Sequence, residues 1–179
     1  MLVKDKYFRL FISENQIQDT IVRLGKEISE DYADKFPIFV VILNGAFMFA
    51  ADLMRQIKFE SQITFVKFTS YQSMESSGEV DELIGLDMDI RNRHIVILED
   101  IVDTGLTMYE VLKEIKKYAP ASIQIAALLQ KPEALRHEIP VAYRGFEIEN
   151  KFVIGYGLDY AGFGRNFKEL FILDETQKA

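Results

Sequence analysis

The stretch Ile95-Val-Ile-Leu-Glu-Asp-Ile-Val-Asp-Thr-Gly-Leu-Thr107 decides how the rest of the chain is interpreted. Its first four residues are apolar, which predicts a buried strand over residues 95–98. Three acidic residues follow that strand, namely Glu99, Asp100 and Asp103. Burying carboxylates costs free energy unless a ligand compensates their charge. The turn over residues 104–107 offers hydroxyls and backbone N–H groups, which suit a phosphate. The stretch therefore indicates a site for a phosphorylated sugar bound together with a divalent cation.

The overall composition is typical of one globular domain spanning residues 1–179. Hydrophobic residues make up 49% of the chain and charged residues 27%, which allows a core and a solvated surface. The net charge of −7 argues against a nucleic-acid partner, because such proteins normally present a basic face. The absence of cysteine excludes a disulfide scaffold and thiolate chemistry. Neither a bilayer-spanning segment nor a signal peptide is recognisable, so we expect a cytoplasmic protein with no membrane partner.

Hydrophobic patterning predicts strands that alternate with helices. A capping box at Ser13–Gln16 precedes a predicted amphipathic helix over residues 14–34. Further helices are predicted over residues 46–56 and 107–118. Strands are predicted over residues 38–43, 62–69, 83–88, 94–98, 123–129, 152–156 and 170–173. This alternation predicts an α/β fold with a central, mainly parallel sheet flanked by helices.

Polar residues follow four of the predicted strands: Asn44-Gly45, Glu99-Asp100, Lys131 and Asp159. Ligands of parallel sheets bind beyond the carboxyl ends of the strands, so we expect these residues to line one crevice. The polar, non-periodic stretch 70–82 is the longest predicted loop, and loops of this length in compact domains often close over active sites.

Two simpler interpretations of the three acids are less favoured. Acidic residues are common at the solvated start of a helix, which accounts for one acid but not for three in so short a stretch. A receiver domain also places acids at strand ends, but its phosphoacceptor pattern lacks the Asp-Thr-Gly-x-Thr turn found at residues 103–107.

Residues 99–107 resemble the phosphoribosyl-pyrophosphate motif of type I phosphoribosyltransferases. Other stretches narrow the resemblance to the hypoxanthine-guanine branch. Residues 43–46 resemble its pyrophosphate loop, and Ser70-Tyr71 resembles the start of its mobile catalytic loop. Residues 128–131 and 151–160 resemble its purine-binding segments, and Arg165 follows at the spacing found in that branch. The resemblance runs from about residue 38 to about residue 174. It implies the type I phosphoribosyltransferase fold, with a small hood subdomain built from the N- and C-terminal segments and a mobile loop over about residues 70–82.

The resemblance implies that one half of the site binds the sugar and its phosphates. The 5′-phosphate is expected at Thr104, Gly105, Leu106 and Thr107. Glu99 and Asp100 are expected to face the ribose hydroxyls, directly or through Mg²⁺, while Asp103 acts as general acid/base at N7 of the purine. Pyrophosphate is expected at Asn44, Gly45 and Arg165. Asn44 departs from many relatives, which carry Lys or Arg there, and the family also suggests a cis peptide bond at Leu43–Asn44.

The other half of the implied site binds the purine. Its expected residues are Lys131, Lys151, Phe152, Val153 and Asp159. Lys131 is expected to donate to the exocyclic O6, which favours 6-oxopurines over adenine because the 6-amino group of adenine is itself a donor. Phe152 is expected to stack on the base and Val153 to contact its edge through the backbone. Asp159 is expected to hold a second Mg²⁺.

The predicted reaction is the transfer of the 5-phosphoribosyl group from phosphoribosyl pyrophosphate to N9 of hypoxanthine or guanine. The products are IMP or GMP and pyrophosphate, as in purine salvage. Two alternatives stay open: a xanthine-preferring enzyme of the same superfamily, and a regulator that keeps the fold but binds nucleic acid. The regulator requires a basic face or an added DNA-binding element, and neither is recognisable. Because relatives form homodimers or homotetramers, the resemblance implies a homo-oligomer.

Overall fold

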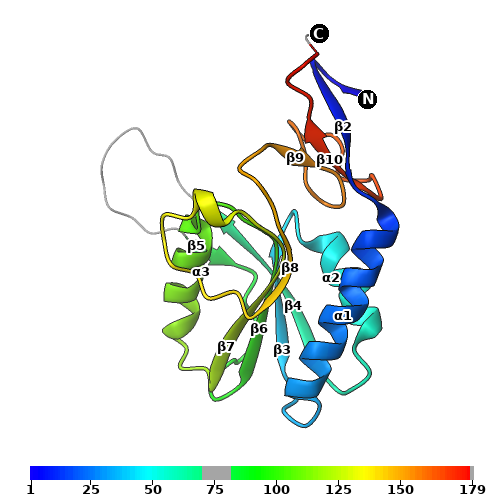
Figure 1. Ribbon diagram of the computed structural model, residues 1–179. Helices are drawn as coiled ribbons and strands as arrows, with labels where there is room; N and C mark the ends of the chain where they lie inside the picture. Colours follow the sequence, from blue (N-terminus) through cyan, green and yellow to red (C-terminus); the bar gives the residue numbers. More distant parts are fainter. Residues whose placement is uncertain (70–81, 178–179) are drawn as a thin grey trace, which may run out of the picture.

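Two sheets and three α-helices make up the part of the chain that the computed structural model describes, residues 1–69 and 82–177 (Figure 1). A six-stranded sheet lies between helices, and a four-stranded sheet, called here the hood sheet, lies at one end of the molecule. Ser70 and Tyr71, at the start of the predicted mobile loop, lie outside the described residues.

The six-stranded sheet has the strand order β5-β4-β3-β6-β7-β8. Five neighbouring strands run parallel: β4 (Gln62–Thr69), β3 (Ile38–Leu43), β6 (His94–Val102), β7 (Ser122–Gln130) and β8 (Tyr143–Glu147). The short β5 (Glu82–Ile84) pairs antiparallel with β4. The predicted central, mainly parallel sheet is therefore confirmed, although β8 was missed because the sequence Tyr-Arg-Gly-Phe-Glu has no apolar run.

Three helices cover the two faces of this sheet. Helices α1 (Glu14–Tyr32) and α2 (Phe47–Gln56) share one core with Phe39 and Leu98, while α3 (Leu106–Lys116) shares the other with Val40 and Ile97. Successive strand residues thus point into opposite cores. The predicted capping box is confirmed, since the Ser13 backbone N–H donates to Gln16 at 3.0 Å and the Gln16 N–H to the Ser13 hydroxyl at 3.4 Å.

Helix α1 ends at Tyr32, two residues before its predicted end. Phe36 takes a φ of +47° immediately before Pro37, and a residue that precedes proline is disfavoured in the helical conformation. None of the helices among the described residues is long and apolar enough to cross a membrane.

The hood sheet joins the two ends of the chain in the order β1-β2-β10-β9. Its strands are β1 (Leu2–Val3), β2 (Lys6–Ile12), β10 (Leu170–Leu173) and β9 (Val153–Ile154). Residues 152–156 were predicted to form a strand, and β9 lies within this stretch, but it pairs with β10 in the hood sheet and not with the central sheet. That strand is also shorter than predicted, since Gly155 and Tyr156 both take positive φ angles.

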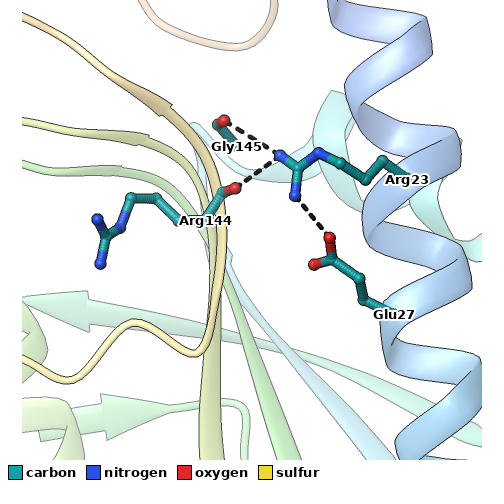
Figure 2. Close-up of polar contacts among 4 residues, drawn as sticks. All are labelled: Arg23, Glu27, Arg144 and Gly145. Atoms are coloured by element: carbon teal, nitrogen blue, oxygen red, sulfur yellow. Dashed lines mark hydrogen bonds and ion pairs between the residues drawn. The ribbon is translucent and has the colours of Figure 1, made fainter.

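A side chain of α1 covers the β8 edge of the central sheet, as Figure 2 shows. The Arg23 guanidinium donates to the Arg144 carbonyl at 2.8 Å and the Gly145 carbonyl at 3.2 Å, and it also pairs with Glu27. Exposed strand edges promote unwanted pairing with other chains, so this contact protects β8. Gly145 also lies so close to β7 that a Cβ atom would overlap the Leu128 carbonyl oxygen.

The substitution Gly145→Ala should lower the free energy of unfolding by about 1–3 kcal/mol, because the added methyl group forces two paired backbones apart. Arg23→Ala is the matched control at the same edge. It removes only a half-exposed side chain and should cost at most about 1 kcal/mol. Urea denaturation of both variants measures the difference, and equal losses would show that the close approach of β7 and β8 is unimportant.

Candidate active site

The first two acids lie within β6 rather than after it. The sequence pattern ended this strand at Leu98, but pairing with β7 continues through Glu99, opposite Ala127, to Val102. Glu99 is 7% exposed, and its Oε2 atom has no hydrogen-bond partner within the described part of the chain. The neighbouring Asp100 accepts a hydrogen bond from the Ile101 backbone N–H at 2.9 Å. Glu99 is therefore buried with one oxygen unpartnered, beside the partly buried carboxylate of Asp100.

Burial dominates the ionisation of both acids. It raises the pKa of Glu99 well above the usual range, and the charge of Asp100 adds to this effect. Burial also raises the pKa of Asp100 to about 6, although the nearby Arg165 charge acts in the opposite direction. An unpaired, buried carboxylate oxygen suits a hard divalent cation, and Mg²⁺ typically uses one or two carboxylates together with substrate phosphates. Within the described residues, no cluster of three or more acidic, His or Cys side chains forms a complete metal cage.

The turn after β6 presents an anion-binding surface. Gly105 is the N-cap residue of α3, takes a φ of +80° and has no side chain to cap the helix, while the Leu106 N–H donates to the Thr104 hydroxyl at 3.4 Å. The first N–H groups of a helix have no partners within it, so they are suited to bind a phosphate. A cavity of about 220 Å³ opens beside the turn, and its polar lining includes Glu99, Asp103, Thr104 and Thr107. The exposed side chain of Leu106 belongs to the same turn.

The ends of β6 and β7 are joined by a charged pair. Lys131 directly follows β7 and is 6% exposed, and its ammonium lies 2.6 Å from the Oδ2 atom of Asp103. The Asp103 side chain is 44% exposed, so the pair has one buried and one accessible partner. The sequence pointed to both residues separately but gave no sign of their contact, which joins positions 28 residues apart.

An aromatic cluster in the hood sheet positions Phe152. Its ring packs against Phe8 of β2, with ring centroids 6.3 Å apart, and against Tyr160, with ring centroids 5.8 Å apart and the rings nearly perpendicular. Phe152 is still 43% exposed, which leaves room for a flat ligand, whereas the adjacent Val153 is buried. The Tyr160 hydroxyl donates to Asp5 at 2.9 Å. The N-terminal hairpin therefore supports the candidate base site. Sequence patterning did not reveal this support.

Lys151 has a partner close to it in the chain. Its ammonium lies 2.6 Å from the Oε2 atom of Glu149, in an ion pair that is largely exposed. Lys151 therefore directly precedes Phe152 of the aromatic cluster in the chain, but its ammonium is directed to Glu149. Its role as a purine-binding residue stays a prediction.

The predicted pyrophosphate loop packs directly on β6. The Leu43–Asn44 peptide bond is cis, and Asn44 is exposed while Gly45 is buried. A Cβ atom at Gly45 would overlap the carboxylate of Asp100, and one at Gly157 would overlap the Gly45 carbonyl oxygen. Only glycine fits at these two positions, so the loop, the β6 acids and the segment after β9 meet at one place.

Arg165 and Asp159 form an ion pair at the same place. The guanidinium of Arg165 lies 2.5 Å from the Asp159 carboxylate and donates to the Gly157 carbonyl at 2.7 Å. Asp159 also accepts from the Gly162 backbone N–H at 2.6 Å. Asp159 does not end a strand of the central sheet, as the sequence suggested, but lies beyond a tight turn after β9. Its role as a ligand of a second Mg²⁺ stays a prediction.

Acids and an amide-rich turn at the carboxyl end of a parallel strand lie where ligands of such sheets bind, and they suit a phosphorylated sugar. The family model described as phosphoribosyl transferase domain matches residues 13–161 of the chain. The chain therefore belongs to the phosphoribosyl transferase family, which confirms the resemblance carried by residues 99–107.

Individual relatives cover nearly the whole chain. Hypoxanthine-guanine phosphoribosyltransferase from Bacillus subtilis is 40% identical over 174 residues, which span 96% of this chain and 96% of that protein. Hypoxanthine-guanine-xanthine phosphoribosyltransferase from Tritrichomonas foetus is 34% identical over 173 residues, covering 96% and 94% of the two chains. The solved structure of hypoxanthine phosphoribosyltransferase from Staphylococcus aureus has a TM-score of 0.87 at 34% identity and covers 96% of this chain and 94% of that chain.

The raised pKa of Asp100 predicts how stability depends on pH in the ligand-free protein. A folded-state pKa of about 6, against 3.8 for the free side chain, means that folding favours the neutral acid. Its contribution to stability is therefore lost as the pH rises from about 4 to about 6. Asp100→Asn should stabilise the ligand-free protein at pH 8 by up to roughly 3 kcal/mol, at 1.4 kcal/mol per pKa unit, and should have little effect near pH 4.

Thermal unfolding at pH 4, 6 and 8 measures this difference. Asp34→Asn, in the exposed turn after α1, is the control for the same chemical change at a solvated position. A melting temperature of Asp100→Asn that stays equal to that of the wild type at pH 8 contradicts the prediction.

Proposed function

We propose that the protein is a hypoxanthine-guanine phosphoribosyltransferase of purine salvage. The observation that carries the proposal is the contact between Lys131 and Asp103, which lie 2.6 Å apart at the ends of neighbouring strands. O6 and N7 are adjacent on one edge of a 6-oxopurine. O6 accepts hydrogen bonds, whereas N7 carries a proton in the tautomer of the free base whose N9 lone pair attacks. A lysine donor for O6 beside a carboxylate that exchanges a proton with N7 matches that edge. The 6-amino group of adenine would instead face a second donor.

The sugar-phosphate half of the proposal rests on the turn and the acids of β6. The 5′-phosphate binds the amides and hydroxyls of residues 104–107, and the ribose hydroxyls face Glu99 and Asp100. Pyrophosphate lies between the Asn44–Gly45 loop and Arg165, whose guanidinium suits phosphate oxygens. The packing of Gly45 against Asp100 supports this placement, because it brings the loop next to the acids.

In the proposed reaction the N9 lone pair of the base forms a bond to C1′ while the bond from C1′ to pyrophosphate breaks. The transition state has oxocarbenium character, and the N7 proton passes to the Asp103 carboxylate. Phe152 and Val153 hold the base, and Lys131 fixes its O6 edge. When bound beside Glu99 and Asp100, Mg²⁺ supplies positive charge to the leaving pyrophosphate, and Asp159 is the proposed ligand for a second ion.

A homodimer or homotetramer is also part of the proposal. It is supported by apolar side chains on the α2 side of the central sheet that lie beyond the cover of α1 and α2. Ile63 and Phe65 of β4 are 37% and 46% exposed, and Phe47 at the start of α2 is 42% exposed. A contact between copies of the chain would bury them.

Incubation with phosphoribosyl pyrophosphate, Mg²⁺ and one base at a time tests the function. Hypoxanthine and guanine should give IMP and GMP, whereas adenine should give no product. Chromatography of the nucleotides measures the outcome. Xanthosine monophosphate as the main product would favour the xanthine-preferring alternative, which the name of the Tritrichomonas foetus relative keeps relevant. No product from any 6-oxopurine would refute the proposal.

The substitution Asp103→Asn tests the assigned proton acceptor. It keeps the size and the hydrogen-bonding oxygen of the side chain but removes its basicity, so turnover should fall by about 100-fold or more. Binding of IMP, measured by calorimetry, should change far less. Asp89→Asn, on the exposed segment before β6, is the control for the same chemical change. Unchanged turnover of Asp103→Asn would remove Asp103 from this role.

A further inference from the structure

Tyr156 lies in the middle of the segment 153–165, which carries proposed base and pyrophosphate contacts, yet the proposed reaction gives it no role. Its side chain is 2% exposed, and its backbone takes a φ of +47°. The hydroxyl donates to the Oδ2 atom of Asp52 in α2 at 2.6 Å. Burial and the Asp52 carboxylate raise the pKa of Tyr156, so the hydroxyl remains a hydrogen-bond donor.

The backbone around Tyr156 hydrogen-bonds within its own part of the chain. The Tyr156 N–H donates to the Phe167 carbonyl and the Gly157 N–H to the Arg165 carbonyl, both at 2.9 Å. Arg165 returns a side-chain hydrogen bond to the Gly157 carbonyl and pairs with Asp159. The segment is therefore held together by its own hydrogen bonds, and the Tyr156 hydroxyl connects it to α2.

The acceptor of this hydrogen bond is itself held in place. The amide of Gln18 in α1 donates to the same Asp52 oxygen at 2.9 Å, and Arg55 lies 2.5 Å from the other oxygen. Helix α2 begins at Phe47, directly after the Asn44–Gly45 loop, so the position of Asp52 and the position of that loop are linked. Figure 1 shows α1 and α2 side by side below the hood sheet.

We infer that Asp52 and Tyr156 are positioning residues that fix the base-binding segment of the hood relative to the pyrophosphate loop. The inference rests on the proposed function, in which the base and the phosphoribosyl donor bind on the two sides of this connection. The hydrogen bond sets the placement of N9 against C1′ and leaves the affinity for either substrate nearly unchanged. Displacements of about 1 Å between reacting groups cost on the order of 100-fold in rate.

Tyr156→Phe tests the inference, with Tyr143→Phe as a matched control. Tyr143 is also buried, and its hydroxyl donates to Asp31 at the same 2.6 Å, but it joins β8 to α1 away from the site. Both variants should lose similar stability. Only Tyr156→Phe should lower turnover, by about tenfold or more per folded site, while calorimetry should give a Kd for Mg²⁺-pyrophosphate within about threefold of the wild type.

Two substitutions at Asp52 provide the complementary test. Asp52→Asn keeps an acceptor oxygen for the Tyr156 hydroxyl, whereas Asp52→Leu removes it. Asn should therefore restore most of the turnover that Leu loses. Equal losses in the two variants, or equal turnover in Tyr156→Phe and Tyr143→Phe, would overturn the inference.

Hydrogen exchange gives a measurement that needs no activity. In Tyr156→Phe the amides of residues 153–165 and 44–50 should exchange faster than in Tyr143→Phe, because the hydrogen bond from the segment 153–165 to α2 is lost. Unchanged exchange in both segments would overturn the inference. A wild-type protein that forms no nucleotide contradicts the proposed function instead, and the exchange experiment still decides whether the connection exists.

Discussion

The placement of two adjacent carboxylates within β6, Glu99 buried and Asp100 partly buried, is the constraint on which the site depends. Glu99 and Asp100 lie inside a paired strand where desolvation favours their neutral forms. The surrounding chain adapts to them: Gly45 has no side chain because one would overlap Asp100, and Arg165 places a positive charge nearby. Desolvating these carboxylates costs folding free energy, and the proposed cation and sugar would offset that cost by binding beside them.

The stability that offsets this cost comes from two apolar cores on either side of the central sheet. Alternating residues of β3 and β6 fill them, with α1 and α2 on one face and α3 on the other. The hood sheet has a separate, smaller core around Val3, Phe8 and Ile154. The candidate site lies where the two sheets approach each other, so each sheet contributes one half of it. Their relative position therefore matters as much as the geometry within either half.

Local patterns in the sequence predicted what depends on local physics. The apolar runs at residues 38–43 and 123–129 became β3 and β7, and Ser13 caps α1 through Gln16. Strand β2 and strand β8 were missed because their apolar residues are interrupted by Arg9 and Gly145. The extension of β6 through its acids depends on pairing with β7, which no local pattern records.

The candidate site was predicted as a set of residues but not as a set of contacts. The family resemblance pointed to Lys131, Asp103, Asp159 and Arg165, yet the ion pairs Lys131–Asp103 and Arg165–Asp159 appear only in three dimensions. Phe8, which packs against Phe152, and Asp5, which accepts from the Tyr160 hydroxyl, carry no recognisable motif. The connection from Tyr156 to Asp52 spans 104 positions in the chain, and side chains that meet over such distances cannot be paired from one sequence.

A crystal structure with Mg²⁺, a non-reactive phosphoribosyl pyrophosphate analogue and hypoxanthine tests the central claim most directly. It should place the 5′-phosphate on the amides of residues 104–107, a metal ion beside Glu99 and Asp100, and the O6–N7 edge of the base against Lys131 and Asp103. A phosphate bound elsewhere, with the β6 carboxylates in contact with neither metal nor sugar, would contradict the proposed role of the buried acids.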